Sequence, residues 1–76
     1  MNLTALHEAV KDRLDVVADH GLRDRDPAAH LQKLMAAAGR LDELVGQLPP
    51  ETDPMLRHYL ERQSYVKALA WLEENR

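Results

Sequence analysis

Four histidines are the residues of this 76-residue chain best suited to chemistry, because imidazole binds metals and transfers protons near neutral pH. A di-iron helical bundle pairs each histidine with a glutamate three residues earlier, and none of the four has one. His20 and His30 flank an expected loop, but a zinc site there would need a third imidazole or a thiolate. The chain has no cysteine. We therefore expect surface histidines and no metal or other cofactor.

Nucleophilic catalysis has two candidate pairs, Thr4 with His7 and Ser64 with Glu61. Both pairs lie on expected helices, without the glycine-rich turn that exposes a nucleophile beside an oxyanion site. The three glycines are scattered, whereas a phosphate-binding loop needs them clustered. We predict that the protein is not an enzyme.

Nucleic-acid binding would use a cluster of basic residues in the last third of the chain, Arg57, Arg62 and Lys67, near Tyr65. The net charge is −3, and no long segment is basic. Phosphate recognition depends on a concentrated positive surface. A regulatory nucleic-acid-binding protein is therefore the alternative function and not the first one.

The residues that must position any site belong to helices. The chain holds 13 Leu and 10 Ala but only five Val, two Thr and no Phe or Ile. Leu and Ala favour helices, and the β-branched residues that favour strands are scarce. No apolar run is long enough to span a membrane, and the first ten residues lack the cations of a secretory signal. We expect an all-α, soluble, cytoplasmic protein with residues 1–76 in one domain.

Start and stop signals divide the chain into three helical segments. Asp26-Pro27 and Asp53-Pro54 each place a carboxylate at an N-cap and a proline at the first helical position. Asn2 or Thr4 can cap the first segment, Gly21 can end it, and Pro49-Pro50 ends the second. The prediction is a small antiparallel three-helix bundle with helices at about 3–20, 27–48 and 54–75.

The first two segments each show one apolar face. In the second, a heptad-like seam is expected to be buried: Leu31, Leu34, Ala38, Leu41, Val45 and Leu48. Small residues at 36–39 flank this seam, and we expect them to pack tightly inside the domain. In the first, the expected buried face is Leu3, Leu6, Val10, Leu14 and Val17. The opposite face is acidic, which we interpret as solvated: Glu8, Asp12, Asp15 and Asp19.

The third segment has apolar residues on two sides. Those of its first half, such as Leu56 and Leu60, cluster opposite those of its second half, such as Tyr65 and Leu72. Since no glycine or proline marks a break, we expect a continuous helix whose second face meets another chain. In the alternative, the helix breaks near residues 62–64 and the same side chains fill the domain core.

In the broken alternative, Tyr59 followed by Tyr65, Ala68 and Leu72 resembles the middle of a tetratricopeptide repeat. The resemblance covers less than a third of the chain. It implies a helical hairpin that packs on its neighbours or binds a peptide. Such repeats usually turn through a glycine, where this chain has Gln63-Ser64.

The function predicted from these patterns is protein–protein interaction or self-association, with a homodimer or a protein partner bound through the third segment. A small chain without disulfides has little core of its own, which favours completion by another chain. The predicted contacts are the apolar residues of that segment, with Trp71, Tyr65 and Leu72 as anchors. The full predicted interface is Leu56, Leu60, Tyr65, Leu69, Trp71 and Leu72.

Overall fold

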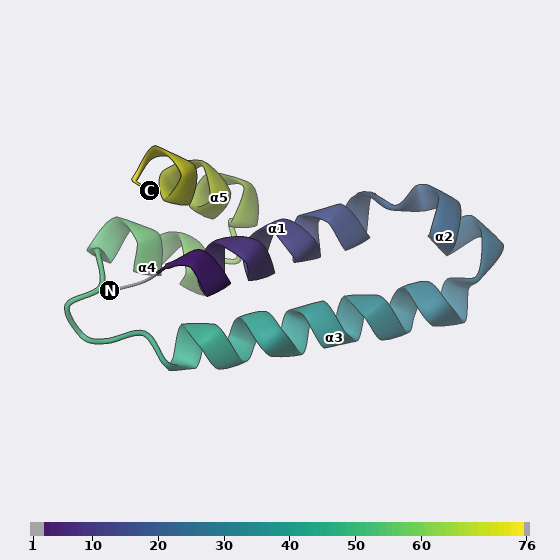
Figure 1. Ribbon diagram of the computed structural model, residues 1–76, viewed down its shortest axis with the longest axis horizontal. Coiled ribbons are helices and arrows are strands. Elements are labelled where there is room, and N and C mark those ends of the chain that lie inside the picture. The colour runs from purple at the N-terminus through teal and green to yellow at the C-terminus, as the bar shows by residue number, and fades with distance from the viewer. Residues whose placement is uncertain (1–2, 76) are drawn as a thin grey trace.

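The structure is a computed structural model that describes residues 3–75, with five helices in that range. α1 (Thr4–Ala18) and α3 (Pro27–Gly46) lie antiparallel and are joined by the short α2 (His20–Arg25). α4 (Pro54–Glu61) and α5 (Tyr65–Glu74) form a second helical hairpin packed on one end of that pair (Figure 1). Since the described residues contain no strand, the all-α prediction is confirmed.

The two Asp-Pro signals start helices as predicted. The Asp26 carboxylate accepts a hydrogen bond from the Ala29 N–H at 3.1 Å at the start of α3. The Asp53 carboxylate accepts from Met55 and Leu56 at 2.9 and 3.3 Å at the start of α4. In both helices the proline follows the cap, where a backbone N–H is not needed.

The start of the first helix differs from the prediction. Leu3 occupies the N-cap position of α1 and makes no side-chain cap, while Thr4 is the first helical residue. Asn2, the other predicted cap, lies outside the described residues.

The loop predicted after residue 20 is wrong, because most of it is α2. The helix is interrupted at Asp19, whose carboxylate accepts from the Leu22 N–H at 3.1 Å and so starts a new helix. Gly21, predicted to end the first helix, lies inside α2 with a negative φ. Nothing in the sequence after Asp19 prevents helix until Asp26-Pro27.

The continuous third helix is also wrong, and the broken alternative is correct. α4 ends at Glu61 and α5 begins at Tyr65. The Ser64 N–H donates to the Tyr59 carbonyl at 2.8 Å and the Gln63 N–H to the Leu60 carbonyl at 3.1 Å. These are the two hydrogen bonds of a Schellman motif. Gln63 has the left-handed backbone that the motif requires, with φ of 58°, at a position that glycine usually fills.

The break lets both apolar sets of the hairpin face one core. Leu56 and Leu60 come from α4, and Ala68 and Leu72 from α5. They pack with four residues from the first pair of helices: Leu6, Ala9, Val10 and Leu41. A straight helix would have turned one of the two sets away from this core.

The loop between α3 and α4 is organised around one carbonyl group. The Pro49 oxygen accepts from the Thr52 N–H at 3.1 Å and from its hydroxyl at 2.7 Å. It also accepts from the Arg57 guanidinium at 2.9 Å. Thr52 is buried. These bonds fix the direction in which α4 follows the loop.

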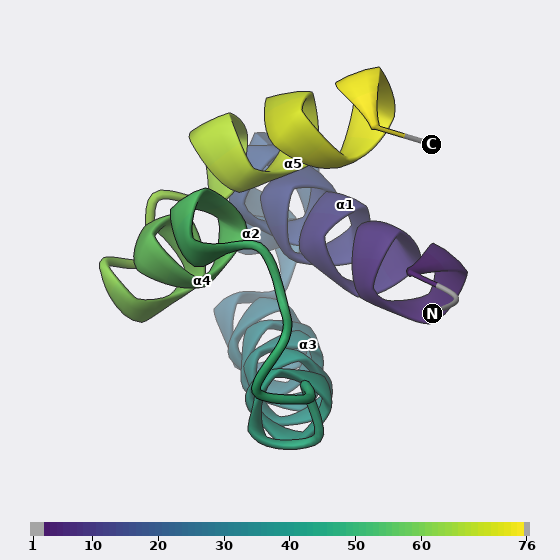
Figure 2. The same cartoon turned by 90° about the vertical axis from the view of Figure 1, so that its left-hand side faces the viewer.

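The hairpin is too short to cover the whole α1–α3 pair. The 20 residues of α3 span about 30 Å, whereas the eight residues of α4 span about 12 Å. Figures 1 and 2 show α4 and α5 gathered at one end, while the pair and α2 extend beyond them. The radius of gyration is 13.1 Å, against about 11 Å for a compact chain of this length. We call residues 15–38 the arm and the rest of the described chain the closed end.

Candidate functional site

The residues considered for chemistry are dispersed. Ser64 lies in the elbow between α4 and α5, where its carbonyl accepts the first hydrogen bond of α5 from Ala68. His20 and His58 are exposed, and His7 is half-buried with Nε2 3.8 Å from Glu73 Oε1. Among residues 3–75, no group of three metal-ligating side chains comes together. No described helix is long and apolar enough to cross a membrane.

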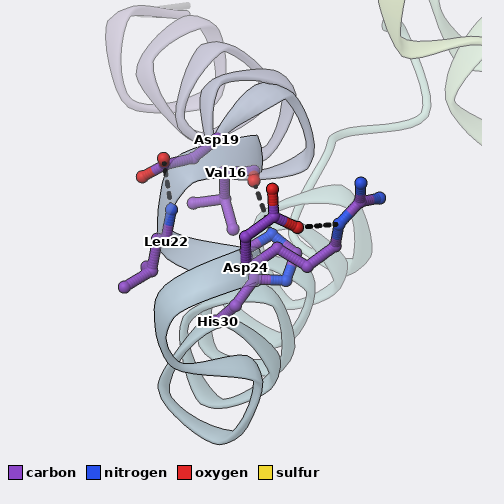
Figure 3. A network of polar contacts seen from close by, with 6 residues as sticks. Val16, Asp19, Leu22, Asp24 and His30 are labelled. Atoms are coloured by element: carbon purple, nitrogen blue, oxygen red, sulfur yellow. Dashed lines mark hydrogen bonds and ion pairs between the residues drawn. The ribbon is translucent and has the colours of Figure 1, made fainter.

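His30 is buried, so the expectation of a surface histidine is wrong at this position. It lies near the start of α3, and its Nε2 hydrogen bonds the Val16 carbonyl of α1 at 2.9 Å (Figure 3). Within the arm it is the only buried residue. The side chain therefore ties together the two helices of the arm where they carry no apolar core.

The six residues of the predicted interface divide into two groups. Leu56, Leu60 and Leu72 are buried in the core of the chain itself, so they do not lie on its surface. The other three are half-buried and pack against that core: Tyr65, Leu69 and Trp71. A contact through this second group remains a prediction.

The three basic residues of the nucleic-acid alternative have different surroundings. Arg57 is half-buried and holds the Pro49 carbonyl, while Arg62 and Lys67 are exposed. An arginine that is needed for the loop contributes less to a phosphate-binding surface. Of the predicted basic cluster, only Arg62 and Lys67 are thus exposed cations without an ion pair to another described residue.

Among residues 3–75, five large apolar side chains are exposed, and three of them lie in the arm. Val17 of α1 is 49% exposed, and Leu31 and Met35 of α3 are 55% and 65% exposed. Val17 and Leu31 were predicted to be buried, and this prediction is wrong. Val10, two turns before Val17 on the same face of α1, is fully buried by the hairpin. The hairpin therefore covers Val10 completely but leaves Val17 half exposed.

The three exposed residues of the arm lie on one side of the α1–α3 pair. Val16 and His30 meet between the two helices. Val17 and Leu31 each follow by one residue, about 100° further around their helices. Because the helices run antiparallel, these two rotations carry both side chains to the same side. Met35, one turn after Leu31, extends that side along α3. We call Val17, Leu31 and Met35 the arm face.

The arm face is free of charge along α3. Between Pro27 and Gly39 the only Asp, Glu, Lys or Arg is Lys33, about 160° around the helix from Leu31 and Met35. Lys33 lines a separate groove between α1 and α3, together with Ala36, Ala37 and Arg40 of α3. Gly39 is exposed, and an added methyl group would meet no atom within 4 Å. The small residues at 36–39 are therefore not all packed inside the domain, contrary to expectation.

The acidic face of α1 has contacts that the sequence did not indicate. Arg40 of α3 lies 3.9 Å from Glu8 and 3.2 Å from Asp12. Asp19 caps α2. All these side chains are exposed, so the ion pairs add little stability and serve mainly to orient α1 on α3.

Sequence reasoning missed the arm face because it depends on where the third helix breaks. Once α4 and α5 are separate, helix lengths alone show that neither can cover α3 from end to end.

Comparison of the chain with models of protein families, with curated proteins and with solved structures finds no match.

Proposed function

We propose that the protein is a non-enzymatic helical module that self-associates through its arm. The observation that carries this proposal is the arm face, three large apolar side chains that the fold leaves uncovered. A monomer of 76 residues would expose this surface to water at one end while its core occupies only the other. Apolar surface of this kind is typical of protein interaction sites.

Shape and charge both support a second copy as the partner of the arm face. Each arm is a pair of antiparallel helices with one apolar side, and two such pairs packed face to face form a four-helix bundle. A twofold axis would bring each arm face against itself. The uncharged side of α3 then meets no like charge, which an isologous contact must avoid.

Sedimentation velocity of the full chain, from micromolar to millimolar concentration, tests this proposal. We expect the mass to rise from 8.7 kDa to twice that value. The double variant Leu31→Glu/Met35→Glu should stay monomeric at all concentrations. Met55→Glu is the matched control, because Met55 is exposed to a similar extent on α4 and should not affect the dimer.

Two results would contradict self-association through the arm. One is a wild-type chain that remains monomeric throughout the concentration range. The other is a dimer that survives the double variant and is lost in Trp71→Asp, provided that circular dichroism shows this variant folded. The second result would return the contact to the residues of α5.

A further inference from the structure

An apolar groove lies between α1 and the start of α5, apart from Leu31 and Met35. Its volume is about 370 Å³. The apolar lining comes from Leu14 and Val17 on one side and from Tyr65 and Val66 on the other. Val66 is 71% exposed, the largest value among the big apolar side chains of the described residues. The remaining lining residues are Arg13, Gln63, Ser64 and Lys67.

Both charged residues in the described lining of the groove are basic. The Arg13 guanidinium carbon lies 5.2 Å from the centre of the Tyr65 ring, a cation–π contact that holds Arg13 in place at the groove. Lys67 is exposed on α5. Among residues 3–75, neither cation lies within 4 Å of a carboxylate, whereas Arg23 and Arg40 both do. The chain has a net charge of −3, whereas the lining of this groove is positively charged.

We infer that the groove binds an acidic amphipathic helix of a partner protein. A third helix can lie between two packed helices and place apolar residues, spaced three and four apart, against the lining. Carboxylates beside that apolar stripe would meet Arg13 and Lys67, which have no acidic partner among the described residues. This ligand is distinct from the second copy proposed for the arm face.

Charge also decides against a second copy at this groove. A twofold contact through this groove would bring the basic residues Arg13 and Lys67 of the two copies close to one another. Like charges opposed in this way oppose association. The groove and the arm face therefore take different partners, although Val17 belongs to both.

Two fluorescent peptides, both constrained to be helical, provide the test. They share leucines at positions i, i+3, i+4 and i+7 and differ only in the flanking residues, which are glutamate in one and lysine in the other. Fluorescence anisotropy is measured with the full chain carrying Leu31→Glu/Met35→Glu, so that self-association through the arm cannot interfere. We expect the acidic peptide to bind about tenfold or more tightly than the basic one, and to weaken as salt is added.

Variants of exposed groove residues locate the binding. Val66→Asp should weaken the acidic peptide about tenfold or more, while Met55→Asp, an exposed apolar position on α4, should leave it unchanged. The double variant Arg13→Glu/Lys67→Glu should reverse the preference and bind the basic peptide more tightly. Thermal unfolding followed by circular dichroism confirms that each variant remains folded.

The inference is overturned if the acidic peptide shows no saturable binding, if both peptides bind equally, or if Val66→Asp has no effect. The same holds if the charge-reversed variant keeps the wild-type preference. None of these outcomes changes the sedimentation expected of the wild-type chain. Peptide binding at the groove and self-association through the arm can therefore be refuted independently.

Discussion

The two ends of the α1–α3 pair share helices and periodicity but differ in what covers them. At the closed end, Val10 and Leu41 are fully buried beneath α4 and α5. In the arm, Val17 continues the face of Val10 and Leu31 begins the seam that includes Leu41, yet both are exposed. An amphipathic pattern therefore marks where a helix can be covered, and the length of the neighbouring helices decides where it is covered.

The two ends should differ most in how much a leucine side chain contributes to the free energy of unfolding. Leu41→Ala should lower the free energy of unfolding by about 3 kcal/mol, because it leaves a cavity in the core. Leu31→Ala should change it by less than about 0.5 kcal/mol, because Leu31 is exposed. Urea denaturation at dilutions where the chain is monomeric measures both. Equal effects would mean that the arm is covered within the chain.

Next in size is the buried histidine of the arm. His30→Ala should cost about 2 kcal/mol, since it removes the hydrogen bond to the Val16 carbonyl together with a buried ring. His30→Gln can keep a donor at that position and should cost less. Hydrogen exchange should show the loss of protection concentrated in residues 15–38. A loss spread evenly over the closed end would contradict this role.

At the closed end, two arginines of similar sequence context should differ. Arg57→Ala should lower stability by about 1 kcal/mol, because the guanidinium holds the Pro49 carbonyl. Arg62→Ala should stay within about 0.5 kcal/mol of the wild type, because Arg62 is exposed. Thermal unfolding of the two variants side by side gives the comparison. Identical melting curves would mean that the hydrogen bond from Arg57 to the Pro49 carbonyl does not stabilise the protein.

The smallest expected effect is at the elbow that separates α4 from α5. Gln63→Gly should raise the free energy of unfolding by about 0.5 kcal/mol, because glycine adopts the left-handed conformation without strain. Gln63→Val should lower it by about 1 kcal/mol, because a β-branched residue resists that conformation. Urea denaturation distinguishes them. The opposite order would indicate a continuous helix across residues 61–65.

The sequence predicted the helical class and the starts of α3 and α4 because Asp-Pro pairs act through local hydrogen bonds and a fixed φ. The elbow was not predicted because glutamine, not glycine, occupies the left-handed position of its Schellman motif. Several other errors follow from the break at Gln63. Leu56, Leu60 and Leu72 were assigned to a partner because a straight helix cannot turn them all inward. Leu31 was assigned to the core because it lies on the heptad-like seam of the second segment, and the short hairpin leaves it exposed.

Burial of His30 could not be predicted either, because it depends on how α1 packs against α3. Its hydrogen-bond partner, Val16, is fourteen residues away in sequence. Periodicity alone could not predict the arm face either, since its residues continue the buried apolar stripes of α1 and α3 and are themselves apolar. Only the relative lengths of packed helices distinguish the two ends.

The central claim is that the arm face is where another copy binds, and two methionines test it within one sample. Met35 lies on the arm face and Met55 on α4, and both are more than half exposed. With ¹³C-labelled methionine methyl groups mixed with unlabelled chain, we expect intermolecular NOEs, and shifts that change with concentration, at Met35 and not at Met55. Intermolecular NOEs at Met55 alone, or none at either methyl group, would contradict the account.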